Sequence, residues 1–110
     1  MKTISDYTKS YLETALWSSE LDSFSFEDVD LDHLKQAEKD CNLFIKKAED
    51  LLDGLNLNQV MHDFWLTRNG HGAGFCDGDY KKEVGDRLTQ LSKQFRELNC
   101  FVAHGKVFIE

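Results

Sequence analysis

The sequence has 110 residues, of which 41% are hydrophobic and 30% charged, with a formal net charge of -7 at pH 7. A chain of this length is expected to form one domain, residues 1–110, around a single modest core. No apolar run is long enough to span a bilayer, and the first residues lack the apolar core of a signal peptide, so no membrane association is expected. Three cysteines without metal-type spacing predict buried or free thiols in a reducing cytosol.

The charge is unevenly distributed along the chain. Residues 1–55 hold 13 acidic and 6 basic residues, whereas residues 56–110 hold 7 of each. Nucleic acids and anionic membranes repel such a chain at long range, which argues against a general nucleic-acid-coating role. The acidic residues are densest in a segment without Lys or Arg, and this segment forms a candidate interaction surface: Glu20, Asp22, Glu27, Asp28, Asp30 and Asp32. These carboxylates either imitate a phosphate backbone or form a solvated helix entry that the helix dipole favours.

Apolar residues at steps of three and four predict helices over 4–17, 31–53 and 80–97. Asp30 is placed to cap the second of these helices, because an aspartate side chain accepts hydrogen bonds from free backbone N–H groups. Gly54 is placed to end the same helix in a left-handed conformation.

The segment 55–69 has two interpretations. Asn58 as an N-cap, apolar pairs four residues apart and Asn69-Gly70 as a stop signal favour a helix. In the alternative, residues 63–67 form a strand and Asn69-Gly70 a hairpin turn. We favour the helix, because the cap, the pairs and the stop agree.

Two short apolar runs on either side of His104-Gly105 predict a β-hairpin over residues 98–110. The acidic connection 18–30 is expected to be pinned by its aromatic residues and to contain a short helical turn from Ser25. The expected fold is α+β: a mostly helical single domain of three to four helices with a short C-terminal antiparallel β-hairpin. The hairpin needs helices beneath it, because an isolated ribbon is marginally stable.

The glycine-rich stretch after Arg68 has the ingredients of an anion site. Glycines allow several backbone N–H groups to converge, Arg68 supplies a planar fork for phosphate or carboxylate, and Asn69 and His71 add donors. The residue order fits neither a P-loop nor a dinucleotide-binding fingerprint, so the alternative is a tight loop whose glycines only permit turns and close packing. The candidate binding residues are Arg68, Asn69, Gly70, His71, Gly72, Gly74, Phe75 and Asp77.

The same stretch contains residue types that occur in metal and catalytic sites. The spacing of His62, His71, Cys76 and Asp77 matches no zinc pattern, so no metal ligand and no cofactor are expected. His71 with Asp63 or Asp77 supplies acid–base groups for a small enzyme, but no known catalytic motif accompanies them.

Residues 63–75, which read DFWLTRNGHGAGF, resemble a signature of small acidic proteins from tailed bacteriophages and prophages. The resemblance extends to residues 11–18 (YLETALWS), to residues 85–89 (GDRLT), to the acidic middle and to the hairpin, and so covers most of the chain. The chain departs from that family at Cys76, where the family has Trp. If that Trp belongs to a binding surface, the surface is weaker here. The resemblance implies a phage accessory protein and no particular activity.

These observations favour a non-enzymatic phage or prophage accessory protein that binds a host or phage macromolecule, with a host or phage protein as the expected partner. Host takeover or inhibition of a defence system, in the host bacterial cytoplasm, is the expected purpose. The first alternative is a nucleotide- or nucleic-acid-binding module that uses the loop 68–75. The second is a small enzyme that uses His71 with Asp63 or Asp77.

Overall fold

The computed structural model describes residues 4–70, 74–75 and 80–110. In these ranges the elements are α1 (Asp6–Ser18), η1 (Phe26–Asp28), α2 (Leu31–Lys47), η2 (Glu49–Leu51), α3 (Leu57–Arg68), α4 (Lys82–Ser92), β1 (Cys100–Ala103) and β2 (Lys106–Ile109). The mostly helical α+β fold with a C-terminal antiparallel hairpin is therefore confirmed. No helix among the described residues is long and apolar enough to cross a membrane.

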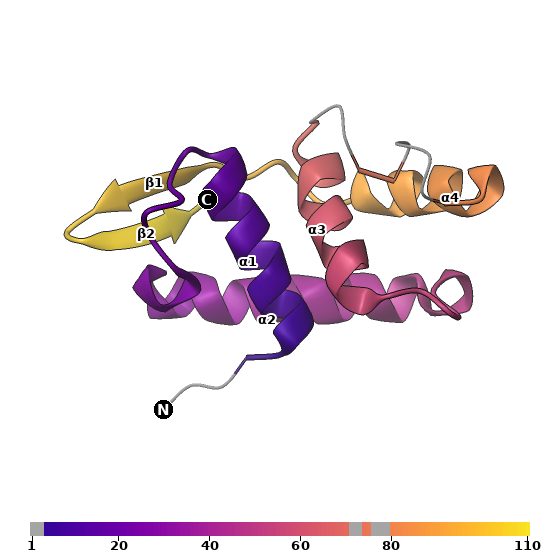
Figure 1. Cartoon of the computed structure of the whole chain (residues 1–110), viewed down its shortest axis with the longest axis horizontal. Helices are drawn as coiled ribbons and strands as arrows, with labels where there is room; N and C mark the ends of the chain where they lie inside the picture. Colours follow the sequence, from indigo (N-terminus) through magenta and orange to yellow (C-terminus); the bar gives the residue numbers. More distant parts are fainter. Residues whose placement is uncertain (1–3, 71–73, 76–79) are drawn as a thin grey trace.

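The core lies where α1 and α3 cross the long helix α2 (Figure 1). Tyr11 of α1 meets Trp65 of α3 edge to face, with 5.3 Å between ring centroids. Phe44 of α2 stacks on Phe64 of α3 at 4.2 Å. Aromatic pairs at these separations add to the stabilisation that burial itself provides, so α3 is held from two directions.

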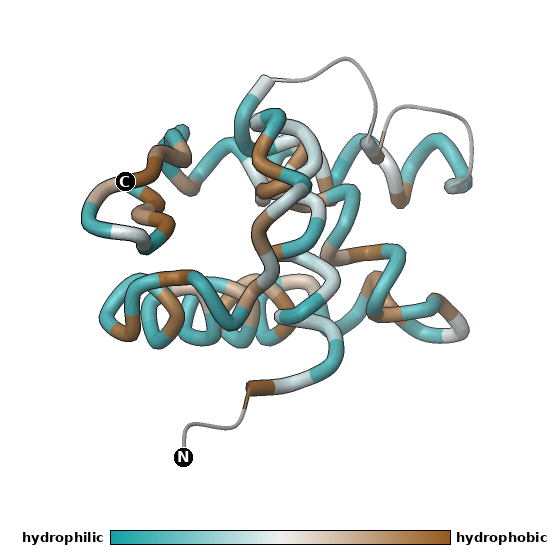
Figure 2. Tube along the Cα trace, turned by 60° about the vertical axis from the view of Figure 1, so that its left-hand side comes forward, coloured by the Kyte–Doolittle hydropathy of each residue, from teal (hydrophilic) through white to brown (hydrophobic). Residues whose placement is uncertain are grey.

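The helix α2 is amphipathic, and Figure 2 shows hydrophobic and hydrophilic residues alternating along it. Asp30 caps it as expected, because its side chain accepts a hydrogen bond from the Asp32 N–H at 3.2 Å. The helix ends at Lys47, earlier than the predicted 31–53, because the chain tightens at Ala48 into the 3-10 turn η2. Gly54 has the expected left-handed conformation, with φ of 76°, but it follows η2 and does not end α2, whose C-cap is Ala48.

The segment 55–69 contains the helix α3 (Leu57–Arg68), so the helix prediction is confirmed and the strand alternative is wrong. Its N-cap is Asn56 and not Asn58, since the Asn56 side chain accepts hydrogen bonds from the N–H groups of Asn58 and Gln59. The helix is enclosed on most sides, so its buried residues include polar ones: Val60, Met61, Asp63, Phe64, Trp65, Leu66, Thr67 and Arg68. A helix with so little exposed surface has no simple one-sided stripe, which explains why the sequence pattern was ambiguous.

The helix α4 is also shorter than the predicted 80–97. Gly85 lies in its middle, where glycine weakens a helix. A Cβ added to Gly85 would lie 2.6 Å from the carbonyl oxygen of Phe75. Glycine at this position therefore permits close packing of α4 against the chain near Phe75.

The hairpin matches its prediction, with the turn at His104-Gly105, both of which have positive φ. Its inner strand β2 joins the body through Val107, which bridges in parallel to Val29 and is fully buried. The short helical turn expected from Ser25 is also present as η1. The N-terminal and C-terminal parts of the chain therefore meet at β2.

Candidate functional site

Arg68 lies inside the protein. Its side chain is 2% exposed and forms an ion pair with Asp40 of α2, with 2.9 Å between Nη1 and Oδ2. The same Nη1 donates to the Tyr11 hydroxyl at 2.9 Å, and Nε and Nη2 both donate to the carbonyl of Arg96. Burial raises the pKa of Tyr11, although Arg68 opposes the shift, so the phenol stays neutral in this network. We call Arg68, Asp40 and Tyr11 the buried network.

Arg68 was expected to bind an external anion, and the buried network corrects this expectation. The guanidinium of Arg68 already donates to Asp40, to Tyr11 and to the Arg96 carbonyl. Asn69 is engaged in the same way: its Nδ2 donates to the Trp65 carbonyl, and its Oδ1 accepts from the Leu98 N–H at 2.7 Å. Both side chains tie the end of α3 to other parts of the fold. Neither is presented to an external anion.

The described glycine-loop residues also have structural roles. Gly74 has φ of 127°, and a Cβ added to it would collide with the hydroxyl of Thr67. The N–H of Phe75 donates to that hydroxyl, and the Phe75 ring is buried against Phe44. The candidate contacts of Gly74 and Phe75 are therefore used inside the protein, whereas Gly70 is exposed.

The remaining loop candidates, His71, Gly72 and Asp77, lie outside the described residues, and so does Cys76. Asp63, the described member of the proposed catalytic pairs, is buried and accepts hydrogen bonds from Gln59 and from the Tyr80 hydroxyl. These bonds give Asp63 a structural explanation that needs no catalysis.

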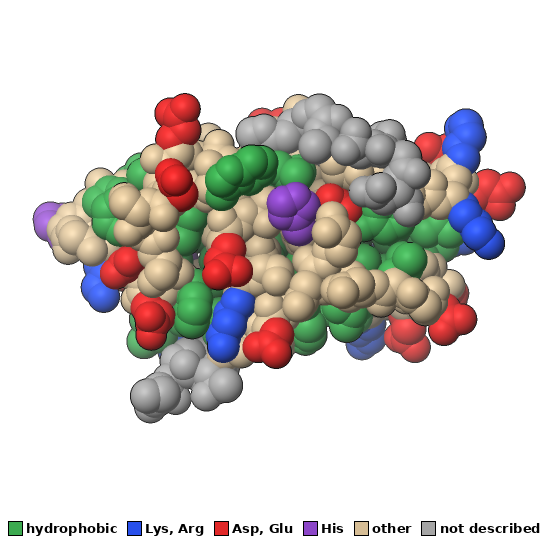
Figure 3. All heavy atoms as spheres, in the orientation of Figure 1, with side chains coloured by type: hydrophobic (Ala, Val, Ile, Leu, Met, Phe, Trp, Pro, Cys, Tyr) green, Lys and Arg blue, Asp and Glu red, His purple; other side chains and the backbone are tan. Residues whose placement is uncertain are grey.

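The candidate interaction surface between Glu20 and Asp32, called the acidic surface below, has two kinds of carboxylate. Asp28 and Asp30 act as caps: Asp28 accepts from the Ser25 N–H at 2.9 Å, and Asp30 from the Asp32 N–H. The other four side chains of the set are exposed: Glu20, Asp22, Glu27 and Asp32. Acidic groups are spread over the visible face of the molecule, with hydrophobic side chains reaching the surface between them (Figure 3). The interaction role of the acidic surface stays a prediction.

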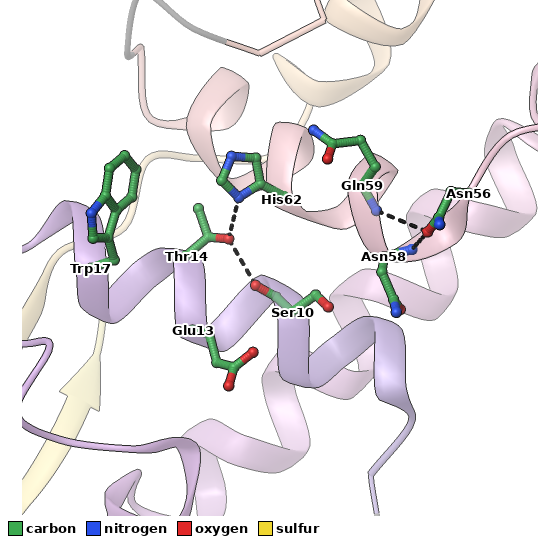
Figure 4. A pocket seen from close by; sticks show the side chains of 8 residues that line it. All are labelled: Ser10, Glu13, Thr14, Trp17, Asn56, Asn58, Gln59 and His62. Carbon is green, nitrogen blue, oxygen red and sulfur yellow. Dashed lines mark hydrogen bonds between the residues drawn. The ribbon is translucent and has the colours of Figure 1, made fainter.

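An open groove of about 400 Å³ lies between α1 and the start of α3 (Figure 4). We call it the α1–α3 groove. Its lining is Ser10, Glu13, Thr14 and Trp17 from α1 and Asn56, Asn58, Gln59 and His62 from the α3 side. Trp17 is 60% exposed, and its indole stacks loosely on the His62 ring with 6.2 Å between centroids.

The hydrogen bonds of Thr14 fix the proton on His62. The Thr14 hydroxyl lies 2.8 Å from the Ser10 carbonyl, which only accepts, so the single hydroxyl proton is donated there. Nδ1 of His62 lies 2.8 Å from the same hydroxyl and must donate to it. In the neutral ring Nε2 therefore carries no proton and remains a hydrogen-bond acceptor.

The groove is rich in acceptors, and none of its lining residues in the described part of the chain is Lys or Arg. Glu13 contributes an exposed carboxylate, His62 its Nε2, and Gln59 its carbonyl oxygen, since the Gln59 amide nitrogen donates to Asp63. An aromatic face beside acceptors and a carboxylate suits a cationic, donor-rich group such as guanidinium.

The described residues of the groove do not form a catalytic arrangement. His62 is oriented by a hydroxyl and not by a carboxylate, and Glu13 points away from it (Figure 4). Within residues 4–70, 74–75 and 80–110, no three His, Cys, Asp or Glu side chains gather in a way that holds a metal ion. The groove therefore presents binding groups and no recognisable reaction centre.

No pattern in the sequence predicts this groove. Trp17 and His62 come from helices that are distant in the chain, and nothing local indicates that α1 and α3 pack side by side. A tryptophan at the polar end of α1 was the available signal.

Comparison with family models, with curated proteins and with solved structures finds no match to this chain.

Proposed function

We propose that this chain is a non-enzymatic binding protein whose partner presents a cationic side chain to the α1–α3 groove. The setting we propose is a phage or prophage accessory protein that binds a host or phage protein in the bacterial cytoplasm, as the resemblance of residues 63–75 implies. The observation that carries the proposal is the exposed Trp17 beside the acceptor nitrogen of His62.

Tryptophan and arginine are the residues most often found to dominate the energy of protein interfaces. An indole that is mostly exposed in the free protein has apolar area to bury, and arginine is well suited to stack on it. In the groove, the guanidinium of a partner arginine would lie on Trp17 and donate to Nε2 of His62, while the exposed carboxylate of Glu13 adds negative charge to the groove lining.

The charge of the chain supports the same partner chemistry. A net charge of -7 attracts a basic surface at long range and raises the rate of encounter. The exposed carboxylates of Glu20 and Asp22 follow directly after α1 and extend the acidic environment beyond the groove. We therefore expect binding to weaken as salt increases.

The test is capture of partners from a bacterial lysate on the immobilised protein, compared with two variants. Trp17→Ala removes the groove aromatic, and Leu43→Ala removes a comparably exposed apolar side chain, 46% exposed on α2. We expect a partner retained by the wild-type chain and by Leu43→Ala to be lost with Trp17→Ala. Peptides covering the partner's surface then identify the arginine.

Two outcomes contradict the proposal. One is a lysate in which no protein is retained specifically by the wild-type chain. The other is a partner retained equally by Trp17→Ala, by Glu13→Gln and by the wild-type chain, which would move the binding surface away from the groove.

A further inference from the structure

The outer edge of β1 is open. The Glu110 N–H donates to the Asn99 carbonyl at 2.9 Å, and the hairpin register places Phe101 opposite Phe108. In an antiparallel pair, hydrogen-bonded positions alternate with positions whose N–H and C=O groups face outward. Cys100 and Val102 therefore direct their backbone N–H and C=O groups away from β2.

The two outer edges of the hairpin differ. On β2 the outward carbonyls are occupied: Val107 accepts from the Asp30 N–H and Ile109 from Nδ1 of His33, both at 2.9 Å. On β1 the outward backbone groups of Cys100 and Val102 have no hydrogen-bond partner within the described part of the chain. The tip of the hairpin projects from the helices (Figure 1), and Val102 is exposed, whereas Cys100 is half-buried and its Sγ donates to the Ala15 carbonyl of α1 at 3.8 Å.

Nothing in β1 protects its edge from pairing. Sheet edges are usually guarded by lysine, proline or a bulge, and the sequence of β1, Cys-Phe-Val-Ala, has none of these. Its apolar side chains are exposed on both faces, Phe101 at 42% and Val102 at 41%. An open edge with apolar side chains on both faces is suited to the addition of another strand.

We propose that β1 pairs with β1 of a second copy of this chain, antiparallel and about a two-fold axis, to form a continuous sheet across a dimer. The register places Cys100 of each copy opposite Val102 of the other. Each of these residues then exchanges both of its backbone hydrogen bonds. Registers that place Cys100 opposite Cys100, or Val102 opposite Val102, leave the other residue's groups unpaired within the strand.

The side chains agree with this register. Phe101 faces its own counterpart at a non-hydrogen-bonded position, where opposing side chains lie closest. Phe101 already stacks on Phe108 within the hairpin, with 5.6 Å between ring centroids. The dimer therefore extends this stack into a continuous row of phenylalanine rings and covers the exposed face of Phe101.

The charge distribution favours a second copy at this edge. Among residues 98–109 the only formally charged side chain is Lys106, although the whole chain carries -7. The β1 edges are thus a place where two acidic chains can approach with little local repulsion. Long-range repulsion remains, so we expect added salt to strengthen the dimer, opposite to its expected effect on the groove.

Sedimentation equilibrium on the full chain across a concentration series tests the association. We expect the mass to rise towards twice the 12.7 kDa of one chain. Val102→Lys places a charge at the edge and is expected to raise the dissociation constant about tenfold or more. Lys106→Glu, which changes a charge on β2, and Trp17→Ala, which alters the groove, are expected to leave the dimer in place.

Disulfide trapping tests the register in a Cys76→Ser background. Opposed non-hydrogen-bonded positions have a Cα separation that a disulfide spans, so Phe101→Cys is expected to yield a covalent dimer under mild oxidation. Phe108→Cys, on the same face but on β2, is the matched control and is expected not to cross-link. A chain that stays monomeric at every concentration overturns the proposal, as does equal cross-linking of the two variants.

Discussion

Arg68 and His62 belong to the same helix, α3, and both bind residues of α1, yet their surroundings differ. Arg68 is buried, and its guanidinium bonds to Asp40, to Tyr11 and to the Arg96 carbonyl. His62 is half-buried and bonds through Nδ1 to Thr14, with Nε2 left as an acceptor. A polar side chain therefore indicates a binding surface only when its hydrogen-bonding groups are not already paired inside the fold.

The largest expected effect is at Arg68. Arg68→Ala leaves the Asp40 carboxylate and the Tyr11 hydroxyl without their donor, so we expect a loss of about 3–5 kcal/mol in the free energy of unfolding, measured with urea. Arg68→Lys should recover only part of this, because an ammonium group cannot reproduce the planar fork. If Arg68→Ala left the stability unchanged and abolished ligand binding, Arg68 would be a binding residue and not a structural one.

The two tryptophans allow the same comparison between a buried and an exposed side chain. Trp65 is buried, and its Nε1 donates to the Ser18 hydroxyl at 2.8 Å. Trp65→Ala is expected to cost about 3–5 kcal/mol of stability, and Trp17→Ala to change it by no more than about 0.5 kcal/mol. Thermal denaturation of both variants measures the difference. A strongly destabilised Trp17→Ala protein would mean that the groove indole belongs to the core.

A smaller effect is expected at Gly85 in α4. Helix propensity alone predicts that Gly→Ala stabilises a helix by about 1 kcal/mol. Here the new Cβ would meet the Phe75 carbonyl, so we expect Gly85→Ala to destabilise the protein by about 1–3 kcal/mol. Urea unfolding gives the sign. A stabilised variant would show that the chain near Phe75 is not held tightly against α4.

The smallest expected effect concerns pH and the contact between Ser5 and α2. Burial would raise the pKa of Glu38, but hydrogen bonds from the Ser5 N–H, the Ser5 hydroxyl and the Asn42 amide outweigh burial, and the pKa is lowered. A carboxyl with a lower pKa in the folded chain stabilises the fold above its unfolded pKa, and this contribution is lost as pH falls through the folded value.

We therefore expect Glu38→Gln to reduce the decline in stability on acidification, measured as the melting temperature across a pH series. Glu27→Gln, at an exposed carboxylate, is the control. Equal acid profiles for the wild-type chain and Glu38→Gln would assign the acid sensitivity to other groups.

Local signals in the sequence were sufficient for most of the fold. The apolar stripe of α2, its Asp30 cap and the turn at His104-Gly105 all report interactions between near neighbours. The early end of α2 at Lys47 was missed, because Leu51 and Leu52 continue the helical spacing through a tighter turn. Helix boundaries depend on small differences in backbone geometry that side-chain periodicity does not record.

The candidate site was harder to predict, because its determinants are distant in sequence. An arginine before glycines suggests an anion site when Asp40 and Tyr11, 28 and 57 positions away, are not considered. The groove has the same origin, since Trp17 and His62 become neighbours only when α1 packs on α3. Residue types therefore identified the polar side chains, but they did not show which of these side chains are hydrogen-bonded inside the protein.

The contact between β2 and the N-terminal half has a consequence for the order of folding. His33 donates to the carbonyl of Ile109 across 76 positions of sequence, and Val107 bridges to Val29 over a similar span. Closing so long a loop costs entropy before any contact compensates it. Crossing of the three core helices, which are closer in sequence, is expected to come first and to shorten this loop. Docking of the hairpin is then the late step, and substitutions at Val107 should accelerate unfolding more than they slow folding.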